Sequence, residues 1–225
     1  MSSSNHREII YTLGSPRSGN TWLCRLLGDA LNSPIQSGLR FPSNADEGFD
    51  RPGCFVIRMR HHRLIHNGFP HGARLIQIVR DPRDVLVSVK EYWKCQWSDA
   101  LVRVGRWQEH NREWLTRSPA VRFEDLLAEP LQYLDSLLIQ IGLEQSPEIV
   151  DAAVGRQEWE RRRKSITPDL PYGPEHQLVV LGQGRTGRWR ENLTREFGQT
   201  AHILFWPLMQ ELGYETDEHW WEELP

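Results

Sequence analysis

The order of apolar and polar residues along the chain predicts alternating β-strands and α-helices. Four short apolar runs rich in β-branched residues indicate strands at residues 9–13, 54–59, 74–79 and 120–123. Apolar residues at helical spacing indicate helices over residues 21–31, 82–93, 126–141, 147–164 and 194–212. Strands separated by helices usually pair in parallel. We therefore expect an α/β fold, a three-layer sandwich with a mainly parallel central sheet.

Capping residues and loops refine this pattern. Asp81 is suited to cap the helix that starts with Pro82, and Pro207 should bend or restart the last helix. Residues 33–53 and 165–188 are rich in Gly, Pro and Ser and are expected to form long loops. Long loops in a compact α/β domain usually carry function.

Composition narrows the class of protein. With 225 residues, 39% hydrophobic and 25% charged, we expect one soluble globular domain over residues 1–225. A net charge of -3 disfavours nucleic-acid binding, which relies on basic surfaces. The sequence has no stretch long and apolar enough for a membrane span and no signal-peptide pattern, so a cytoplasmic location is expected. Cys24, Cys54 and Cys95 lack a CxxC pairing, which favours free thiols over a zinc site.

The most informative segment runs from Gly14 to Trp22 and reads GSPRSGNTW. It follows a predicted strand and opens a predicted helix. Backbone N–H groups at a helix start point outward, and the helix dipole adds positive charge, so such a loop can hold an anion. Gly19 lets the backbone approach that anion closely. The segment is therefore a candidate phosphate-binding loop.

This loop departs at one position from the G-x4-G-K-[ST] pattern that binds ATP and GTP. Gly14, Gly19 and Thr21 match the pattern, whereas Asn20 stands where a Lys would reach the β and γ phosphates. The cation of the loop is instead Arg17. A kinase without that Lys loses a main source of charge stabilisation, which favours another donor. A P-loop-type nucleotide kinase or NTPase is kept as the alternative.

Two motifs together resemble the sulfotransferase family that uses 3′-phosphoadenosine-5′-phosphosulfate (PAPS). Residues 17–22, RSGNTW, resemble the family's [KR]-S-G-[ST]-T-W loop, and residues 75–88, LIQIVRDPRDVLVS, resemble its 3′-phosphate motif. Alone, the second motif would fit a capped helix with surface ion pairs. The resemblance implies a P-loop NTPase-like sulfotransferase fold. It also implies in-line transfer of a sulfuryl group from PAPS to a hydroxyl or amine, releasing 3′-phosphoadenosine-5′-phosphate (PAP).

The resemblance implies roles for individual residues. Arg17 would contact the phosphosulfate and assist catalysis, and Trp22 would pack against the adenine. Arg80 and Ser88 would bind the 3′ phosphate. The 5′ phosphate would be held by Ser15, Ser18, Gly19, Asn20 and Thr21. Asn20 replaces the family's Ser or Thr, so altered contacts are expected there, and no metal is expected.

Two further segments resemble the family less completely. Phe123 stands in place of a Tyr beside the adenine and would offer stacking without a hydroxyl. A segment expected to close over the 3′ phosphate corresponds to Gly184, Arg185, Thr186 and Gly187. The basic pair that the family carries before it is Gly182 and Gln183 here. Either Arg185 supplies the missing charge, or the affinity for the 3′ phosphate is reduced.

The sequence offers several candidates for the general base. Many family members carry a catalytic His just after a strand, and here Arg60, His61 and His62 follow the strand at residues 54–59. His62 is favoured over His61, and a general base contributes about 10²–10⁴-fold in rate. Arg60 at that place, or a carboxylate elsewhere acting as base, stays open. A metal site at the neighbouring His residues is disfavoured by their spacing.

The acceptor is not identified by these motifs. Variable loops around residues 33–53, 93–110 and 165–182 would select it, and a small molecule or a glycan is expected. A non-catalytic PAP- or PAPS-binding module is a second alternative, suggested by Asn20 and Phe123. Neither nucleic acid nor a membrane is expected as a partner, and a homodimer is left open.

Overall fold

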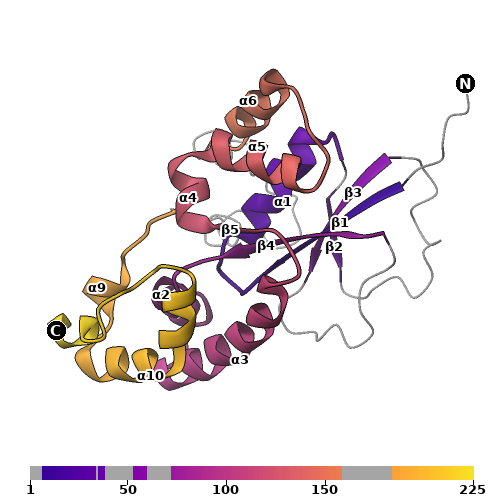
Figure 1. The fold of residues 1–225 in the computed structure, drawn as a ribbon. Helices are drawn as coiled ribbons and strands as arrows, with labels where there is room; N and C mark the ends of the chain where they lie inside the picture. The colour runs from indigo at the N-terminus through magenta and orange to yellow at the C-terminus, as the bar shows by residue number, and fades with distance from the viewer. Residues whose placement is uncertain (1–6, 34, 39–52, 60–71, 159–183) are drawn as a thin grey trace, which may run out of the picture.

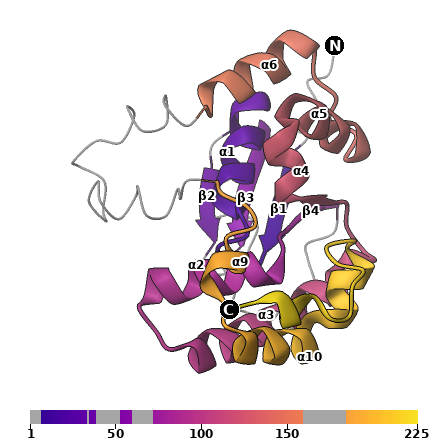
Figure 2. The same ribbon diagram turned by 90° about the vertical axis from the view of Figure 1, so that its left-hand side faces the viewer.

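The computed structural model describes residues 7–33, 35–38, 53–59, 72–158 and 184–225. In Figure 1 a central β-sheet lies between two groups of helices. The same three layers are visible after a quarter turn in Figure 2. This is the layered α/β arrangement predicted from the alternation of strand and helix patterns.

Within the described residues, the sheet has five strands in the order β2-β3-β1-β4-β5, and every pairing is parallel. The strands are β1 Arg7–Gly14, β2 Ile35–Gly38, β3 Gly53–Met59, β4 Arg74–Val79 and β5 Ala120–Arg122. The register places Tyr11 of β1 beside Ile57 of β3 and Leu75 of β4. The carboxyl ends of the strands therefore share one edge, where open parallel sheets bind their ligands.

Helices cover both faces of the sheet. One face carries α1 Asn20–Ala30, α4 Phe123–Ala128, α5 Pro130–Gln140 and α6 Pro147–Arg156. The other carries α2 Pro82–Trp93, α3 Trp97–Leu115, α9 Trp189–Asn192 and α10 Arg195–Glu211, followed by the 3₁₀ helix η1 Trp220–Glu223. None of the helices in the described parts of the chain combines the length and hydropathy that crossing a membrane requires.

Two elements differ from the sequence-based expectation. The strand β2 lies inside the predicted loop at residues 33–53. The prediction of a variable loop around residues 93–110 is wrong, because α3 occupies most of it. Among the α3 residues whose side chains the structure describes, a narrow stripe that includes Ala100 and Val104 is buried against the core. Charged and polar residues interrupt that stripe in the sequence and hide it.

Of two prolines that bear on the predicted helices, Pro130 divides a helix and Pro207 does not. The helix predicted over residues 126–141 is divided, because Pro130 starts α5 and has no N–H to continue α4. The last helix is α10, which runs through Pro207 without restarting. The helix predicted to reach residue 164 ends at Arg156, and residues 159–164 lie outside the described part of the chain.

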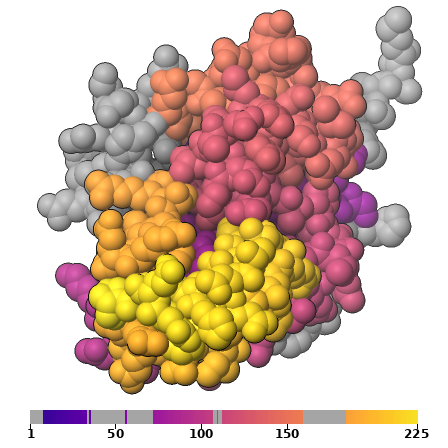
Figure 3. All heavy atoms as spheres, turned by 60° about the vertical axis from the view of Figure 1, so that its left-hand side comes forward, coloured from indigo at the N-terminus to yellow at the C-terminus, as the bar shows by residue number. Residues whose placement is uncertain are grey.

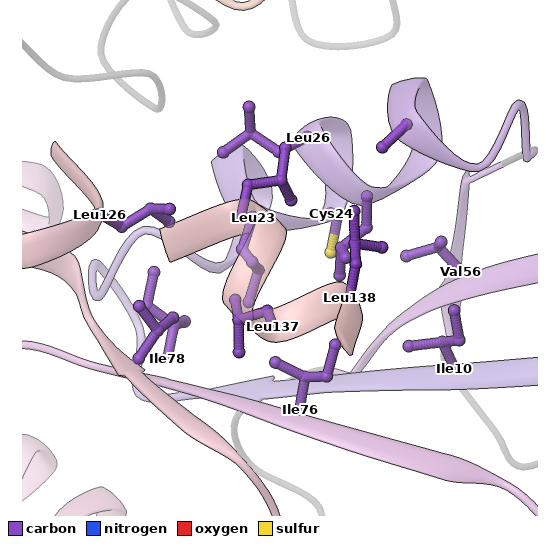
Figure 4. Packing of buried hydrophobic residues seen from close by; sticks show 14 of the residues in the cluster. Ile10, Leu23, Cys24, Leu26, Val56, Ile76, Ile78, Leu126, Leu137 and Leu138 are labelled. Carbon is purple, nitrogen blue, oxygen red and sulfur yellow. The ribbon is translucent and has the colours of Figure 1, made fainter. Parts of the chain in front are cut away.

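Two hydrophobic clusters form the core. The first, called the sheet cluster, joins the sheet to α1 and α4–α6 and is shown in Figure 4. Its members include Ile10, Leu23, Cys24, Leu26, Val56, Ile76, Ile78, Leu126, Leu137 and Leu138. The second, called the helix cluster, is built from helical and adjoining residues on the opposite side. Its members include Val85, Leu86, Val89, Ala100, Val104, Trp189, Phe205, Met209 and Trp220.

Candidate active site

The loop between β1 and α1 has the backbone of an anion-binding site. Arg17 (φ 66°) and Gly19 (φ 98°) are both left-handed, and such residues in a turn direct successive N–H groups into one concavity. Gly19 is also the N-cap of α1, so the first N–H groups and the dipole of the helix add to the same place. The Ser18 hydroxyl donates to the Ser15 carbonyl at 2.7 Å and closes the turn.

The close approach of Phe123 leaves no room for a side chain at position 19, so a glycine is required there. A Cβ atom at Gly19 would lie 2.5 Å from Cδ2 of Phe123. The Phe123 ring meets the Trp22 ring edge-on at 5.9 Å and is only 6% exposed. Phe123 therefore packs against the loop at Gly19. Because Phe123 is largely buried, little of its ring is exposed for an adenine to stack on.

Asn20 points into the protein. Its side chain is buried, and Nδ2 donates to the Thr12 carbonyl of β1 at 3.3 Å. Its Oδ1 faces the thiol of Cys24 at 3.8 Å, and that thiol also lies 2.9 Å from the Thr12 hydroxyl. The group of Asn20 that faces the loop is consequently its backbone N–H. The side chain fastens the loop to the central strand.

Arg17 reaches from the loop to helix α2. Its Nε donates a hydrogen bond of 2.9 Å to Oγ of Ser88. Its guanidinium also lies over the ring of Tyr92, 4.8 Å from the ring centre. Ser88 and Tyr92 are one helical turn apart and present one face of α2 to the loop.

Arg80 also contacts the loop, through the backbone of Arg17. Its Nη1 donates to the carbonyl of Arg17 at 2.9 Å, and its Nη2 donates to the carbonyl of Arg185 at 2.8 Å. The guanidinium covers the ring of Phe123 at 4.6 Å. Among the described residues, no group accepts a hydrogen bond from the buried Nε of Arg80. The side chain thus joins the loop, the 184–187 segment and α4, and keeps donors for a further acceptor.

The two guanidinium groups make the site attractive to an anion. Burial, together with the neighbouring charge of Arg80, lowers the pKa of Arg17. Burial also lowers the pKa of Arg80, although Asp84 and Glu124 raise it in part. Two buried cations that repel one another gain from an anion placed between them, as charge-assisted hydrogen bonds to phosphate provide.

A closed ring of hydrogen bonds fixes the backbone next to Arg80. The Asp81 N–H donates to Oε1 of Glu124 at 3.1 Å, and the Tyr214 hydroxyl donates to Oε2 of the same carboxylate at 3.0 Å. Arg83 Nη2 donates to the Tyr214 carbonyl at 3.1 Å and to Oδ2 of Asp81 at 2.8 Å. Burial raises the pKa of Glu124 and that of Tyr214.

Arg83 is the buried centre of this support. Its guanidinium lies 3.9 Å from the ring centre of Trp189 and 4.8 Å from that of Trp220. Its Nη1 donates to Oε2 of Glu215 at 2.7 Å. Burial disfavours the charge, but hydrogen bonds to Asp81 and Glu215 outweigh it, so the pKa of Arg83 is raised. Figure 3 shows the C-terminal residues, in yellow, at the surface beside the orange and magenta segments.

The structure brings most of the predicted site residues together. The loop residues from Ser15 to Trp22 lie at the start of α1, and Arg17, Ser88 and Arg80 are linked by hydrogen bonds. The segment from Gly184 to Gly187 meets this cluster through the carbonyl of Arg185, while the Arg185 and Thr186 side chains are exposed.

Part of the predicted site lies outside the described residues. This applies to Arg60, His61, His62, Gly182 and Gln183, so the general base stays a prediction. Within the described residues, no group of three or more His, Cys, Asp or Glu side chains is arranged to hold a metal ion.

Sequence reasoning missed two residues of the site. Tyr92 follows Ser88 by four residues, and that helical spacing could have placed it beside Arg17. Asp84 accepts hydrogen bonds from the N–H groups of Gly187 and Trp189, at 2.7 and 3.2 Å. These two hydrogen-bond donors lie more than 100 residues further along the chain, so no local sequence pattern could identify them.

Comparison with curated proteins finds sulfotransferases. The 3-alpha-hydroxysteroid sulfotransferase of Cavia porcellus is 21% identical, over 96% of this chain and 88% of the relative. Sulfotransferase 2A6 of Rattus norvegicus is 24% identical, over 83% of this chain and 79% of the relative. No protein-family profile matches the chain. These relatives are of the family that the phosphate-loop and 3′-phosphate motifs resemble, and the similarity extends over most of this chain.

Solved structures give the same fold. Mouse sulfotransferase SULT7A1 complexed with PAP matches with a TM-score of 0.71 and 15% identity, over 92% of this chain and 87% of that one. Retinol dehydratase in complex with androsterone and the inactive cofactor PAP matches with a TM-score of 0.68 and 14% identity, over 90% and 81%. The predicted sulfotransferase fold is therefore confirmed.

Proposed function

We propose that this protein is a PAPS-dependent sulfotransferase that moves a sulfuryl group to the hydroxyl of a small-molecule acceptor and releases PAP. The observation that carries the proposal is the joining of Arg17 and Arg80 in one buried cluster. Arg80 donates to the Arg17 carbonyl, and Arg17 donates to Ser88. A donor with phosphates at both its 5′ and 3′ positions matches two cations placed this way.

In this proposal some residues bind the two phosphates of PAPS, and Arg17 stabilises the charge that develops during transfer. The N–H groups at the start of α1 hold the 5′ phosphate, and Arg80 with Ser88 holds the 3′ phosphate. As the acceptor oxygen bonds to sulfur, the bond from sulfur to the bridging phosphate oxygen breaks, and its electrons pass to that phosphate. Arg17 stabilises the negative charge left there. The acceptor proton passes to a base, for which His62 and His61 remain the predicted residues.

The acceptor is proposed from the relatives. Two relatives, both from Cavia porcellus, are named hydroxysteroid sulfotransferases, and two structures of retinol dehydratase hold androsterone or retinol. All of these are small alcohols, which favours a small-molecule hydroxyl over a glycan for this chain. A single domain over residues 1–225 and a cytoplasmic location are proposed on the sequence arguments given above.

The kinase alternative is weakened by Asn20. A nucleotide kinase needs a cation from this position to reach the β and γ phosphates. Here the side chain is turned into the core and bonded to the Thr12 carbonyl.

The test combines binding and transfer. Thermal stability is measured with PAP and with Mg-ATP, since a ligand at 100 times its dissociation constant adds about 2.7 kcal/mol. Radiolabelled PAPS is then incubated with hydroxysteroids, retinol, phenols, amines and sugars. Arg17→Ala is compared with Arg106→Ala, which changes an exposed arginine of α3.

The proposal predicts stabilisation by PAP and label transfer to an alcohol. Arg17→Ala should abolish most turnover while Arg106→Ala behaves like the wild type. Stabilisation by Mg-ATP alone would overturn the proposal in favour of a kinase. Stabilisation by PAP with no transfer to any acceptor would favour a non-catalytic nucleotide-binding module.

A further inference from the structure

We propose that Asp84 is a positioning residue, which holds both Arg80 and the segment 185–189 in the geometry that recognises the 3′ phosphate of the donor. The inference rests on the proposed function, because it takes Arg80 as the 3′-phosphate ligand. It adds a residue that contacts no donor atom in that scheme. Asp84 would act through its neighbours.

Hydrogen bonds and a charge contact link the three partners. Asp84 Oδ2 accepts from the Gly187 N–H at 2.7 Å, and Oδ1 accepts from the Trp189 N–H at 3.2 Å. Oδ2 also lies 4.0 Å from Nη2 of Arg80. That Nη2 donates to the Arg185 carbonyl at 2.8 Å. The segment is therefore held by hydrogen bonds at two places: Arg80 bonds to residue 185, and Asp84 bonds to residues 187 and 189.

The position of Asp84 separates this role from ordinary helix capping. The N-cap of α2 is Asp81, whose Oδ1 accepts from the Arg83 N–H at 2.9 Å. Asp84 lies in the first turn, where a carboxylate favours the helix dipole, yet both of its oxygens bond to a different part of the chain. Its contacts therefore serve the site beside Arg80 more than they serve α2.

Burial makes these contacts consequential. The Asp84 side chain is 1% exposed and that of Arg80 is 10% exposed. Burial raises the pKa of Asp84, although Arg80 and the two N–H donors lower it. A carboxylate removed from water keeps its charge only while such partners stay in place. Moving the segment or the Arg80 guanidinium would leave it uncompensated, so each partner restrains the other.

A second contact of the segment offers a matched control. Arg188 Nη1 donates to Oε2 of Glu91 at 2.9 Å, and Glu91 is exposed on α2. Glu91→Gln therefore removes a carboxylate that holds the same segment to the same helix without touching Arg80. Exposed ion pairs contribute little, so this change should alter nucleotide affinity by about twofold or less.

The experiment measures binding of PAP and of adenosine 5′-monophosphate, which lacks the 3′ phosphate, by calorimetry. Asp84→Asn should lower the affinity for PAP by about 10- to 100-fold and leave that for the monophosphate nearly unchanged, because hydrogen bonds to charged groups are the strong ones. In an Arg80→Gln background, Asp84→Asn should add no further loss of PAP affinity. Glu91→Gln is the control in both backgrounds.

The outcomes separate the two proposals. If the wild type binds PAP no better than the monophosphate, the 3′-phosphate assignment and the proposed function fail together. If the wild type prefers PAP and Asp84→Asn keeps that preference, only the role of Asp84 is overturned. Losses that simply add in the double variant would also overturn it, since Asp84 would then act independently of Arg80.

Amide hydrogen exchange in the wild type gives a measurement that does not depend on folding of a variant. The Gly187 and Trp189 N–H groups bond to Asp84, so the inference predicts slower exchange at both with PAP than with the monophosphate. Equal exchange with the two nucleotides at saturation would contradict the coupling.

Discussion

The Nε of Arg17 donates to Oγ of Ser88 at 2.9 Å, across a separation of 71 residues. A serine hydroxyl accepts this bond and still has its own proton to donate. In the proposed scheme the Ser88 hydroxyl therefore accepts from Arg17, which contacts the phosphosulfate of PAPS, and donates to the 3′ phosphate of PAPS. One hydroxyl would then be linked to the residues that bind both ends of PAPS.

Ser88→Ala tests that shared role. The change should lower PAP affinity by about tenfold, because one hydrogen bond to a charged group is lost, and should also reduce kcat. Calorimetry and steady-state kinetics with the best acceptor measure the two effects. Ser118→Ala is the control, since the Ser118 hydroxyl is similarly buried but bonds to the Trp114 carbonyl at 3.0 Å. A wild-type kcat in Ser88→Ala would mean that Arg17 needs no help from Ser88.

Asn20→Ala should act on stability more than on the ligand. The side chain is buried and its amide satisfies the Thr12 carbonyl, so its loss should reduce the free energy of unfolding by about 1–3 kcal/mol. Urea denaturation measures this. Asn192→Ala removes an exposed amide bonded to the Arg188 carbonyl and should cost much less. A variant of Asn20 with unchanged stability but poor PAP binding would show that this side chain faces the nucleotide.

Gly19→Ala should damage both the loop and its support. The residue is left-handed with φ 98°, and the added Cβ would meet Phe123 at 2.5 Å. The backbone strain alone costs about 1–2 kcal/mol, so a lower melting temperature and weak PAP binding are expected. The matched change Gly105→Ala adds a Cβ in open space within α3 and should stabilise the protein by about 0.5–1 kcal/mol. Normal PAP affinity in Gly19→Ala would argue against the loop as the phosphate site.

Glu124→Gln gives a pH-dependent signature. Burial raises the pKa of Glu124 above its ordinary value of 4.5, against hydrogen bonds that lower it. The folded state then binds more protons than the unfolded state as pH rises above 4.5, so the stability contributed by Glu124 is lost there. The difference in unfolding free energy, wild type minus Glu124→Gln, should be largest below pH 4.5 and fall as pH increases. Denaturation curves between pH 4 and about 7 measure it, and a difference that grows with pH would contradict the prediction.

The sequence predicted those parts of the fold that depend on local patterns. The helix from Pro82 to Trp93 and the strand from Arg74 to Val79 have the predicted bounds, because a capping Asp, a first-turn Pro and apolar periodicity all act locally. Helix α3 was missed because a narrow buried stripe among charged residues resembles a loop. Its apolar partners come from α2 and α10, which no local pattern identifies.

The site was predicted to a similar degree. Motifs identified Arg17, Arg80 and Ser88, and the structure joins all three. The direction of the Asn20 side chain was not predictable, since it depends on a carbonyl of the neighbouring strand. The contact of Asp84 with Gly187 was equally hidden, because it crosses 103 residues of chain.

The division of the core into a sheet cluster and a helix cluster has a consequence for motion. Phe123 belongs to the first cluster, whereas Ser88 sits on α2, whose apolar residues belong to the second, and Arg17 and Arg80 tie the two together. A nucleotide bound at this junction would contact residues from both clusters and would therefore oppose local opening of either one. Occupancy should then slow proteolytic cleavage in both layers at once, including regions far from any atom of the ligand.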